Sequence, residues 1–186
     1  MRKIIIVLAA AFFMSSAGEA KEIAGVVFPD TLKNDSLVLS LNGAGIRTKF
    51  FMDLYVGGLY LKQKERNPEN IIRADEPMAL RLHIISSLIT SEKMEAATRE
   101  GFVSSTSGNT DPLRDQIESF VLIFKEKIEK NDIYDMVYVK NVGTKVYKNS
   151  KLKAVIAGIP FKQALFGIWL CEKPAQASLK KEMLGQ

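Results

Sequence analysis

The residues best suited to bind or react with a ligand lie in one stretch of the 186-residue chain, positions 43–61, which reads GAGIRTKFFMDLYVGGLYL. Arg47 supplies a permanent cation near its start, and Tyr55 and Tyr60 supply hydroxyl groups farther along. A strand that carries these groups among bulky β-forming residues could form one wall of an acid-binding cleft, because charge-assisted hydrogen bonds are strong where water is excluded. The alternative is a core strand whose arginine lies in solvent, as single charged residues near strand ends often do.

Other chemistries lack the residues that they need. The chain has one histidine, His83, and one cysteine, Cys171, so neither a Ser-His-acid triad nor a zinc site is expected. The motifs G-x-S-x-G, G-x-x-x-x-G-K-[ST] and G-x-G-x-x-G are absent from the sequence. We therefore predict no cofactor and no metal. The formal net charge of +5 comes from mixed charges without a long basic run, which argues against nucleic-acid binding.

Residues 1–20 have the three-part pattern of a secretory signal peptide: a basic start, an apolar run over positions 4–14, and small residues that end at Ala20. The apolar run is too short to span a bilayer. We predict cleavage after Ala20, with Ala17 as the alternative site and an uncleaved anchor as the alternative reading. The mature protein is then periplasmic or secreted. No later run is long enough to cross a membrane, and residues 21–186 are predicted to form one domain.

The spacing of apolar residues predicts strands and helices in alternating groups. Strand patterns occur at positions 23–28, 37–41, 43–61, 78–85, 137–139, 144–147 and 152–157. Helical patterns occur from Pro68, at 91–103, from Pro112 to Ile128, at 161–170, and around Leu179 and Met183. We expect Asn42-Gly43 to be a hairpin turn, and positions 43–61 to be one long strand bent at Gly57-Gly58. Grouped strands and grouped helices predict an α+β fold with helices on one face of an antiparallel sheet.

The pattern G-A-G-x-R followed by F-x-x-x-Y-x-x-G-L-Y-L, in this order of elements, resembles the chalcone isomerase-like proteins. The signal peptide and the segment IAGVVFP at positions 23–29 resemble the exported bacterial branch of that family. The resemblance covers nearly all of residues 21–186. It implies an open-faced β-sandwich with a cleft between sheet and helices. In that cleft plant enzymes of the family close a flavanone ring without a cofactor, whereas non-catalytic members bind fatty acids.

The resemblance also implies roles for particular residues. The cleft arginine of the family falls on Arg47, and the cleft threonine falls on Tyr55. The tyrosine and asparagine of the catalytic helix fall near Met94 and Gly101, so the polar pair that orients the substrate is missing and chalcone isomerase activity is not expected. We assign the ligand-binding site to a set that lines the expected cleft: Arg47, Phe51, Tyr55, Tyr60 and Met94, with Phe50 and Phe120 as neighbours.

Three functions follow from this reading. The first is a non-catalytic periplasmic protein that binds a fatty acid or a similar amphipathic anion, with the head group on Arg47 and a hydrogen bond from Tyr55. The second is an interaction module of the cell envelope whose cleft is filled by its own side chains. The third is a cofactor-free isomerase of a phenolic or enone substrate. The oligomeric state is left open.

Overall fold

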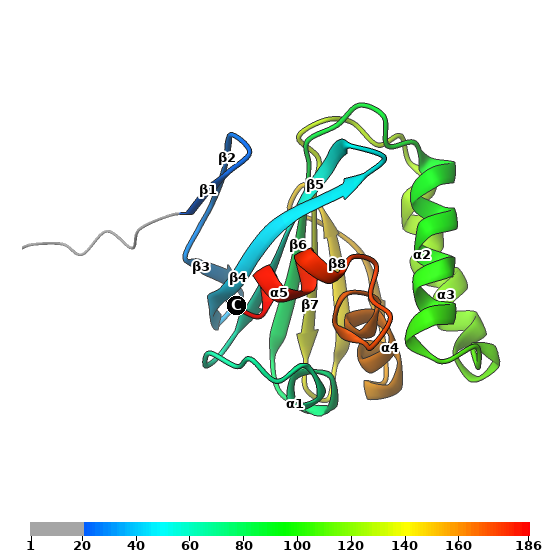
Figure 1. Cartoon of the computed structure of the whole chain (residues 1–186). Coiled ribbons are helices and arrows are strands. Elements are labelled where there is room, and N and C mark those ends of the chain that lie inside the picture. The colour runs from blue at the N-terminus through cyan, green and yellow to red at the C-terminus, as the bar shows by residue number, and fades with distance from the viewer. Residues whose placement is uncertain (1–20) are drawn as a thin grey trace, which may run out of the picture.

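A seven-stranded antiparallel sheet forms the centre of the computed structural model, which describes residues 21–186 (Figure 1). The predicted signal peptide, residues 1–20, lies outside the described residues. The strands follow one another in sheet order as in the chain: β3 (Thr31–Asn34), β4 (Leu37–Lys49), β5 (Met52–Leu61), β6 (Met78–Ile84), β7 (Ile133–Val139), β8 (Gly143–Lys148) and β9 (Lys151–Ile156). A separate hairpin is formed by β1 (Lys21–Ile23) and β2 (Val26–Phe28), where the apolar pattern at positions 23–28 predicts one strand.

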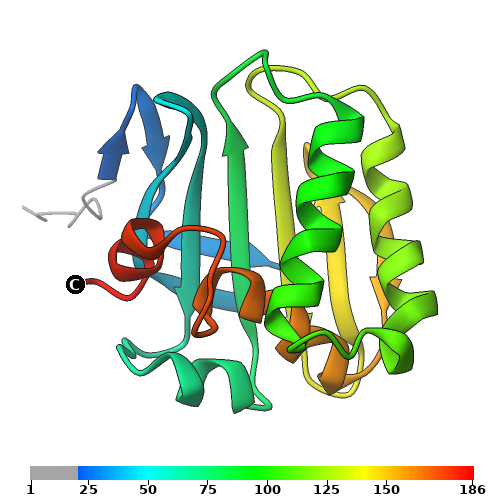
Figure 2. The same ribbon diagram turned by 45° about the vertical axis from the view of Figure 1, so that its right-hand side comes forward.

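Helices cover one face of this sheet, and the β1–β2 hairpin lies on the opposite side (Figures 1 and 2). They are α1 (Pro68–Arg73), α2 (Ser91–Ser105), α3 (Arg114–Val121), α4 (Ile159–Leu170) and α5 (Ala177–Met183), with short 3-10 turns η1 (Asp111–Leu113) and η2 (Leu122–Lys125). Figure 2 shows α2 and α3 side by side in front of the later strands and α5 in front of β4 and β5. The helix predicted from Pro112 to Ile128 therefore ends earlier, because its last turn tightens into η2.

Strict alternation divides the strand residues between two cores. On β5, Leu59 and Leu61 belong to the large core under the helices, whereas Val56 and Tyr60 belong to a smaller core under β2 and β3. His83 is followed by Ile84 of the large core and therefore points to the side away from the helices. This two-sided burial explains why the strands contain so many bulky apolar residues.

The stretch 43–61 is a hairpin and not one long strand. It contains the second half of β4, a two-residue turn at Phe50 and Phe51, and β5. Both turn residues have positive φ, 50° and 63°, as a type I′ turn requires. Asparagine and glycine favour this geometry, and phenylalanine does not, so the sequence carries no turn signal at the position where the chain reverses.

Asn42-Gly43, the expected hairpin turn, is a bulge inside β4. Asn42 is the unpaired residue, and its buried side chain donates to the carbonyl oxygens of Glu65 and Met183, each at 2.9 Å. A Cβ atom at Gly43 would overlap the main-chain oxygen of Glu182 on α5. Asn42 and Gly43 are therefore explained by the close approach of the C-terminal helix.

A buried lysine fixes α1 against α4. Lys162 is fully buried, and its ammonium group donates to the carbonyl oxygens of Ile71 (2.7 Å), Ile72 (2.9 Å) and Ala74 (2.8 Å). These carbonyls lie at the end of α1 and have no partner inside that short helix. Burial lowers the pKa of Lys162 to about 8, and the nearby Asp75 and Glu76 oppose this shift.

Candidate functional site

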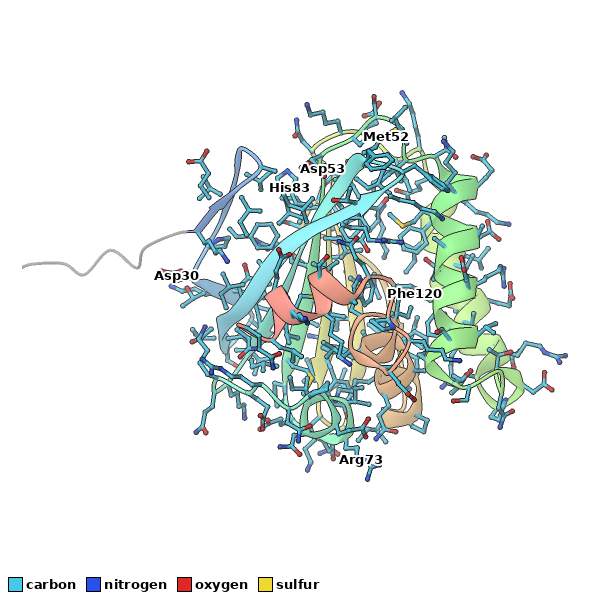
Figure 3. All side chains as sticks on the ribbon, in the orientation of Figure 1. Asp30, Met52, Asp53, Arg73, His83 and Phe120 are labelled. Carbon is cyan, nitrogen blue, oxygen red and sulfur yellow. The ribbon has the colours of Figure 1, made fainter. Side chains whose placement is uncertain are left out.

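A cavity of about 300 Å³ lies between the sheet, α2, α4 and the segment 173–175. Much of its wall is apolar and is contributed by Leu82, Met94, Phe120, Phe124, Met136 and Ile168. Figure 3 labels Phe120 on the inner side of the helix layer. A volume of 300 Å³ is at the lower end of the usual range for ligand pockets and holds about ten groups of the size of a water molecule or a methylene.

The polar end of the cavity is formed by neighbouring strands and the end of α4. Arg47 on β4 is the register partner of Tyr55 on β5, so their side chains lie on the same, helix-covered side. The indole Nε1 of Trp169 donates a hydrogen bond of 3.0 Å to the hydroxyl of Tyr55. All three residues line the cavity. Since Trp169 uses the hydroxyl oxygen as acceptor, the hydroxyl hydrogen of Tyr55 is free to donate to a ligand.

Arg47 is held in place by a glutamine that precedes α5. One terminal nitrogen of the guanidinium donates to Gln176 Oε1 at 2.9 Å and to the carbonyl oxygen of Thr48 at 3.1 Å. The same Gln176 side chain accepts from the Thr48 amide at 2.8 Å and donates to the Ile46 carbonyl at 3.2 Å. The Gln176 side chain therefore satisfies main-chain groups on the edge of β4, as a neighbouring strand would do. This clamp fixes the arginine and closes the sheet edge beside the cavity.

The electrostatics of this end suit an anion. Burial raises the pKa of the Tyr55 hydroxyl above its ordinary value of 10.0, and the bond from Trp169 and the charge of Arg47 oppose this rise without cancelling it. Tyr55 is therefore neutral at physiological pH and can donate a hydrogen bond. Beside it stands a cation that is always charged. Lys49 and Lys173 add further positive charge along the wall, and Glu100 adds one negative charge. A carboxylate or phenolate would find both a countercharge and a donor here.

Three of the predicted ligand-binding residues come together in the structure. Arg47, Tyr55 and Met94 all line the cavity, and so does the expected neighbour Phe120. Their role in binding stays a prediction. Gly101, the second position expected on the helix, also lines the cavity, and its missing side chain lets Ile168 of α4 pack directly on α2.

The structure places Tyr60 and Phe51 elsewhere. Tyr60 is buried in the core on the other face of the sheet, where its hydroxyl donates to the carbonyl oxygen of Pro29 at 3.0 Å. It lies five positions after Tyr55 on one strand, and an odd separation puts two side chains on opposite faces. Phe51 is fully exposed at the hairpin turn, as is most of Phe50. Assigning Phe51 and Tyr60 to the cleft was therefore wrong.

Trp169 and Gln176 were missed by the sequence reading. Trp169 sits in the apolar segment of α4, where its spacing indicates only core packing. Gln176 sits in a polar connection before α5. The lone tryptophan, which carries an N–H group that needs a partner when buried, was the one available signal.

No group of three His, Cys, Asp or Glu side chains among residues 21–186 could hold a metal ion. None of the helices that the structure describes has the length and apolar character needed to cross a bilayer.

Comparison with known proteins identifies the class. The family model described as chalcone isomerase-like matches residues 20–185, and the chain therefore belongs to the chalcone isomerase-like family. The crystal structure of a fatty-acid binding protein of Arabidopsis thaliana has a similar fold, with a TM-score of 0.67 and 17% sequence identity. The match covers 86% of this chain and 92% of that one. A search of curated protein sequences finds no match. The predicted fold class, helices on one face of an antiparallel sheet, is confirmed.

Proposed function

We propose that this chain is a non-catalytic binding protein for a medium-chain fatty acid or a similar amphipathic anion, and that it acts in the periplasm after export. The observation that carries the proposal is the polar end of the cavity. There Arg47 and the Tyr55 hydroxyl meet beside an otherwise apolar space. One end can neutralise an acidic head group, and the remainder can bury a hydrocarbon tail.

The absence of catalysis is supported by the helix that faces the arginine. The resemblance places a polar pair near Met94 and Gly101, and neither of these residues has a side-chain donor that could orient a carbonyl group or hold a water molecule. Thr98 and Ser104 are the hydroxyl residues of α2 at the cavity. The open cavity also favours a binding protein over an interaction module whose cleft is filled. Export is supported by the pattern of residues 1–20.

The similar fold of a protein whose title describes fatty-acid binding gives the proposal its ligand class. The volume gives the size: about ten methylene-sized groups fit, so a saturated acid of about ten carbons matches better than a long-chain one. An acid with a longer tail would have to leave part of it outside.

The test is to extract the purified protein with organic solvent and analyse bound lipids by mass spectrometry, followed by calorimetric titration with decanoate. We expect a co-purified fatty acid and a dissociation constant of tens of micromolar or lower, which corresponds to about −6 kcal/mol or better. Replacing Arg47 with methionine should abolish the affinity. Lys49→Met, at the exposed edge of the same cavity, is the matched control and should weaken binding only slightly. No extracted ligand and no heat of binding would contradict the proposal.

A further inference from the structure

The turn of the β4–β5 hairpin presents an apolar surface to solvent. Phe51 is fully exposed, Phe50 is 77% exposed and Met52 is 40% exposed. Among the large apolar side chains of residues 21–186, Phe51 and Phe50 are the two most exposed. We call residues 49–52 the hairpin tip. Neither view of the ribbon shows a helix or strand covering this tip (Figures 1 and 2), and Figure 3 labels Met52 there.

Folding alone does not account for the two phenylalanines. Both have positive φ, which a side chain with a Cβ atom adopts only at a cost. The turn would form more easily with asparagine and glycine, which also expose no apolar surface. Single exposed apolar residues are normal, but two adjacent aromatic rings at a protruding turn point to a partner.

The shape of the tip fits a membrane interface better than a protein surface. It is a convex protrusion of a few side chains, much smaller than the roughly 800 Å² that each partner of a standard protein–protein interface buries. Apolar side chains that enter the boundary between head groups and acyl chains need only about 5–10 Å of depth. Two phenylalanines and a methionine on one turn can reach that depth while the strands remain in water.

Positive charge at the same end of the sheet complements anionic head groups. The Nζ atom of Lys49 lies 5.7 Å from the ring centre of Phe50. Four lysines near the strand ends, Lys49, Lys93, Lys125 and Lys130, form no ion pair within residues 21–186. In the same part of the described chain, the carboxylates of Asp53 and Glu92 are likewise without a cationic partner.

The loop after β6 adds a second apolar contact at this end. It starts beside the hairpin, where the Ile85 amide donates to the Leu54 carbonyl at 3.0 Å. Leu88 on this loop is 47% exposed, and Lys93 donates to its carbonyl at 3.0 Å. An exposed apolar side chain and a lysine therefore lie together on this loop, as they do at the hairpin tip.

We propose that the hairpin tip inserts into the interface of a bilayer that contains anionic phospholipid. Lys49 belongs both to the tip and to the cavity wall, and Arg47 lies two residues away on the same strand. Insertion would therefore bring the polar end of the cavity against the membrane surface. In that position the protein could exchange a fatty acid with the membrane. This exchange rests on the proposed function, but the insertion itself does not.

The experiment uses purified protein with the same N-terminal form for every variant, so that residues 1–20 contribute equally. Phe51→Trp places a fluorescent reporter on the tip, and the wild-type Trp169, which is 5% exposed, serves as the buried control. Vesicles of phosphatidylglycerol and phosphatidylethanolamine with brominated acyl chains should quench the introduced tryptophan and shift its emission to the blue, and leave Trp169 unchanged. Phosphatidylcholine vesicles should give a much weaker effect.

A second variant keeps the fold and removes the surface. Phe50→Asn/Phe51→Gly should bind the anionic vesicles at least tenfold more weakly than wild type. The matched control is Val142→Ser/Val155→Ser, which removes two exposed apolar residues near the opposite end of the sheet and should bind as wild type does. An unquenched reporter in the Phe51→Trp variant, or equal vesicle binding by the Asn-Gly variant, would overturn the inference. So would a wild-type dimer that dissociates in the Asn-Gly variant, which would assign the tip to a second copy of the chain.

Decanoate titration in vesicle-free solution separates this inference from the proposed function. Decanoate binding without quenching of the reporter on the tip would remove only the membrane contact. Quenching of that reporter in a protein that binds no fatty acid would remove the proposed ligand and leave the membrane contact in place.

Discussion

Replacing Tyr55 with phenylalanine tests the polar end of the cavity while leaving its shape intact. The change removes one oxygen, which accepts the 3.0 Å bond from Trp169 and lies beside Arg47. The chain offers a matched control on the same strand. Tyr60 is also buried and also loses one hydrogen bond when changed to phenylalanine, but it faces the opposite core. Both variants therefore remove one hydroxyl group and one hydrogen bond from the same strand, but only Tyr55 lines the cavity.

The magnitudes follow from the hydrogen bonds. A bond from a neutral donor to a charged acceptor contributes about 1.5–3 kcal/mol, so Tyr55→Phe should weaken decanoate binding by about 10- to 150-fold. Tyr60→Phe should leave the affinity unchanged. Tyr55→Phe leaves the buried Trp169 indole unsatisfied and should lose about 1–3 kcal/mol of stability. Tyr60→Phe leaves the partly buried Pro29 carbonyl without its partner and should lose about 0.5–1.5 kcal/mol.

Isothermal titration calorimetry at pH 7.5 measures the affinities, and urea unfolding measures the stabilities. Because burial holds the pKa of Tyr55 above 10.0, the wild-type affinity should be constant between pH 7 and 9. Equal affinity of wild type and Tyr55→Phe would refute the assignment of Tyr55 as the donor. An equal loss in both variants would show that the effect passes through folding and not through the cavity.

Three further predictions test other parts of the structure. Across saturated acids of six to fourteen carbons, affinity should rise about fourfold per methylene, about 0.8 kcal/mol each, and level off near ten carbons where the 300 Å³ cavity is full; calorimetry that shows a steady rise to fourteen would contradict a tail confined to this cavity. Phe50→Asn/Phe51→Gly should relieve the strained turn and stabilise the protein by about 1–3 kcal/mol, seen as a rise in Tm of several degrees by calorimetry, and an unchanged or lower Tm would refute the strain. Burial lowers the pKa of Lys162 to about 8 in the folded protein, whereas the pKa of a lysine in the unfolded chain is about 10.4. Between these two pH values the folded protein has released the proton and the unfolded chain still binds it. By linkage the stability of wild type relative to Lys162→Met should therefore increase as pH rises from about 8 to 10; a constant or falling difference in urea unfolding would show that Lys162 keeps its proton.

The arrangement of sheet and helices could be predicted because it depends on periodicity. Alternation over positions 78–85 and helical spacing over positions 91–103 each record which side of an element is buried, and these elements were found within two residues. The α+β class followed from their order along the chain. The boundaries of α3 were less accurate, since η2 continues the apolar pattern after the α-helix has ended.

The hairpin could not be predicted from local signals because they point to the wrong place. Asn42-Gly43 is the strongest turn pair in the stretch, yet α5 and the loop after β5 hold it inside β4. Phe50-Phe51, which forms the turn, is a strand signal. Contacts from residues more than a hundred positions away decide the conformation at Asn42, and a single sequence does not show them.

The candidate site could be predicted only in part, because some of its residues are far apart in the sequence. Arg47 and Tyr55 were assigned to one site by the resemblance. The single strand predicted over 43–61 would hold them about 26 Å apart, and the hairpin that the sequence did not predict is what pairs them. Tyr60 could have been excluded by counting, since five positions on a strand change the face. Trp169 and Gln176 complete the site from the other end of the chain, 114 and 129 residues from their partners, where no spacing rule connects them.

The most direct test of the central claim is a crystal structure of the protein with decanoate. The account predicts the carboxylate within hydrogen-bonding distance of the Arg47 guanidinium and the Tyr55 hydroxyl, with the hydrocarbon tail among Met94, Phe120 and Phe124. A carboxylate bound only at the surface lysines, or a cavity that stays empty at saturating decanoate, would contradict it.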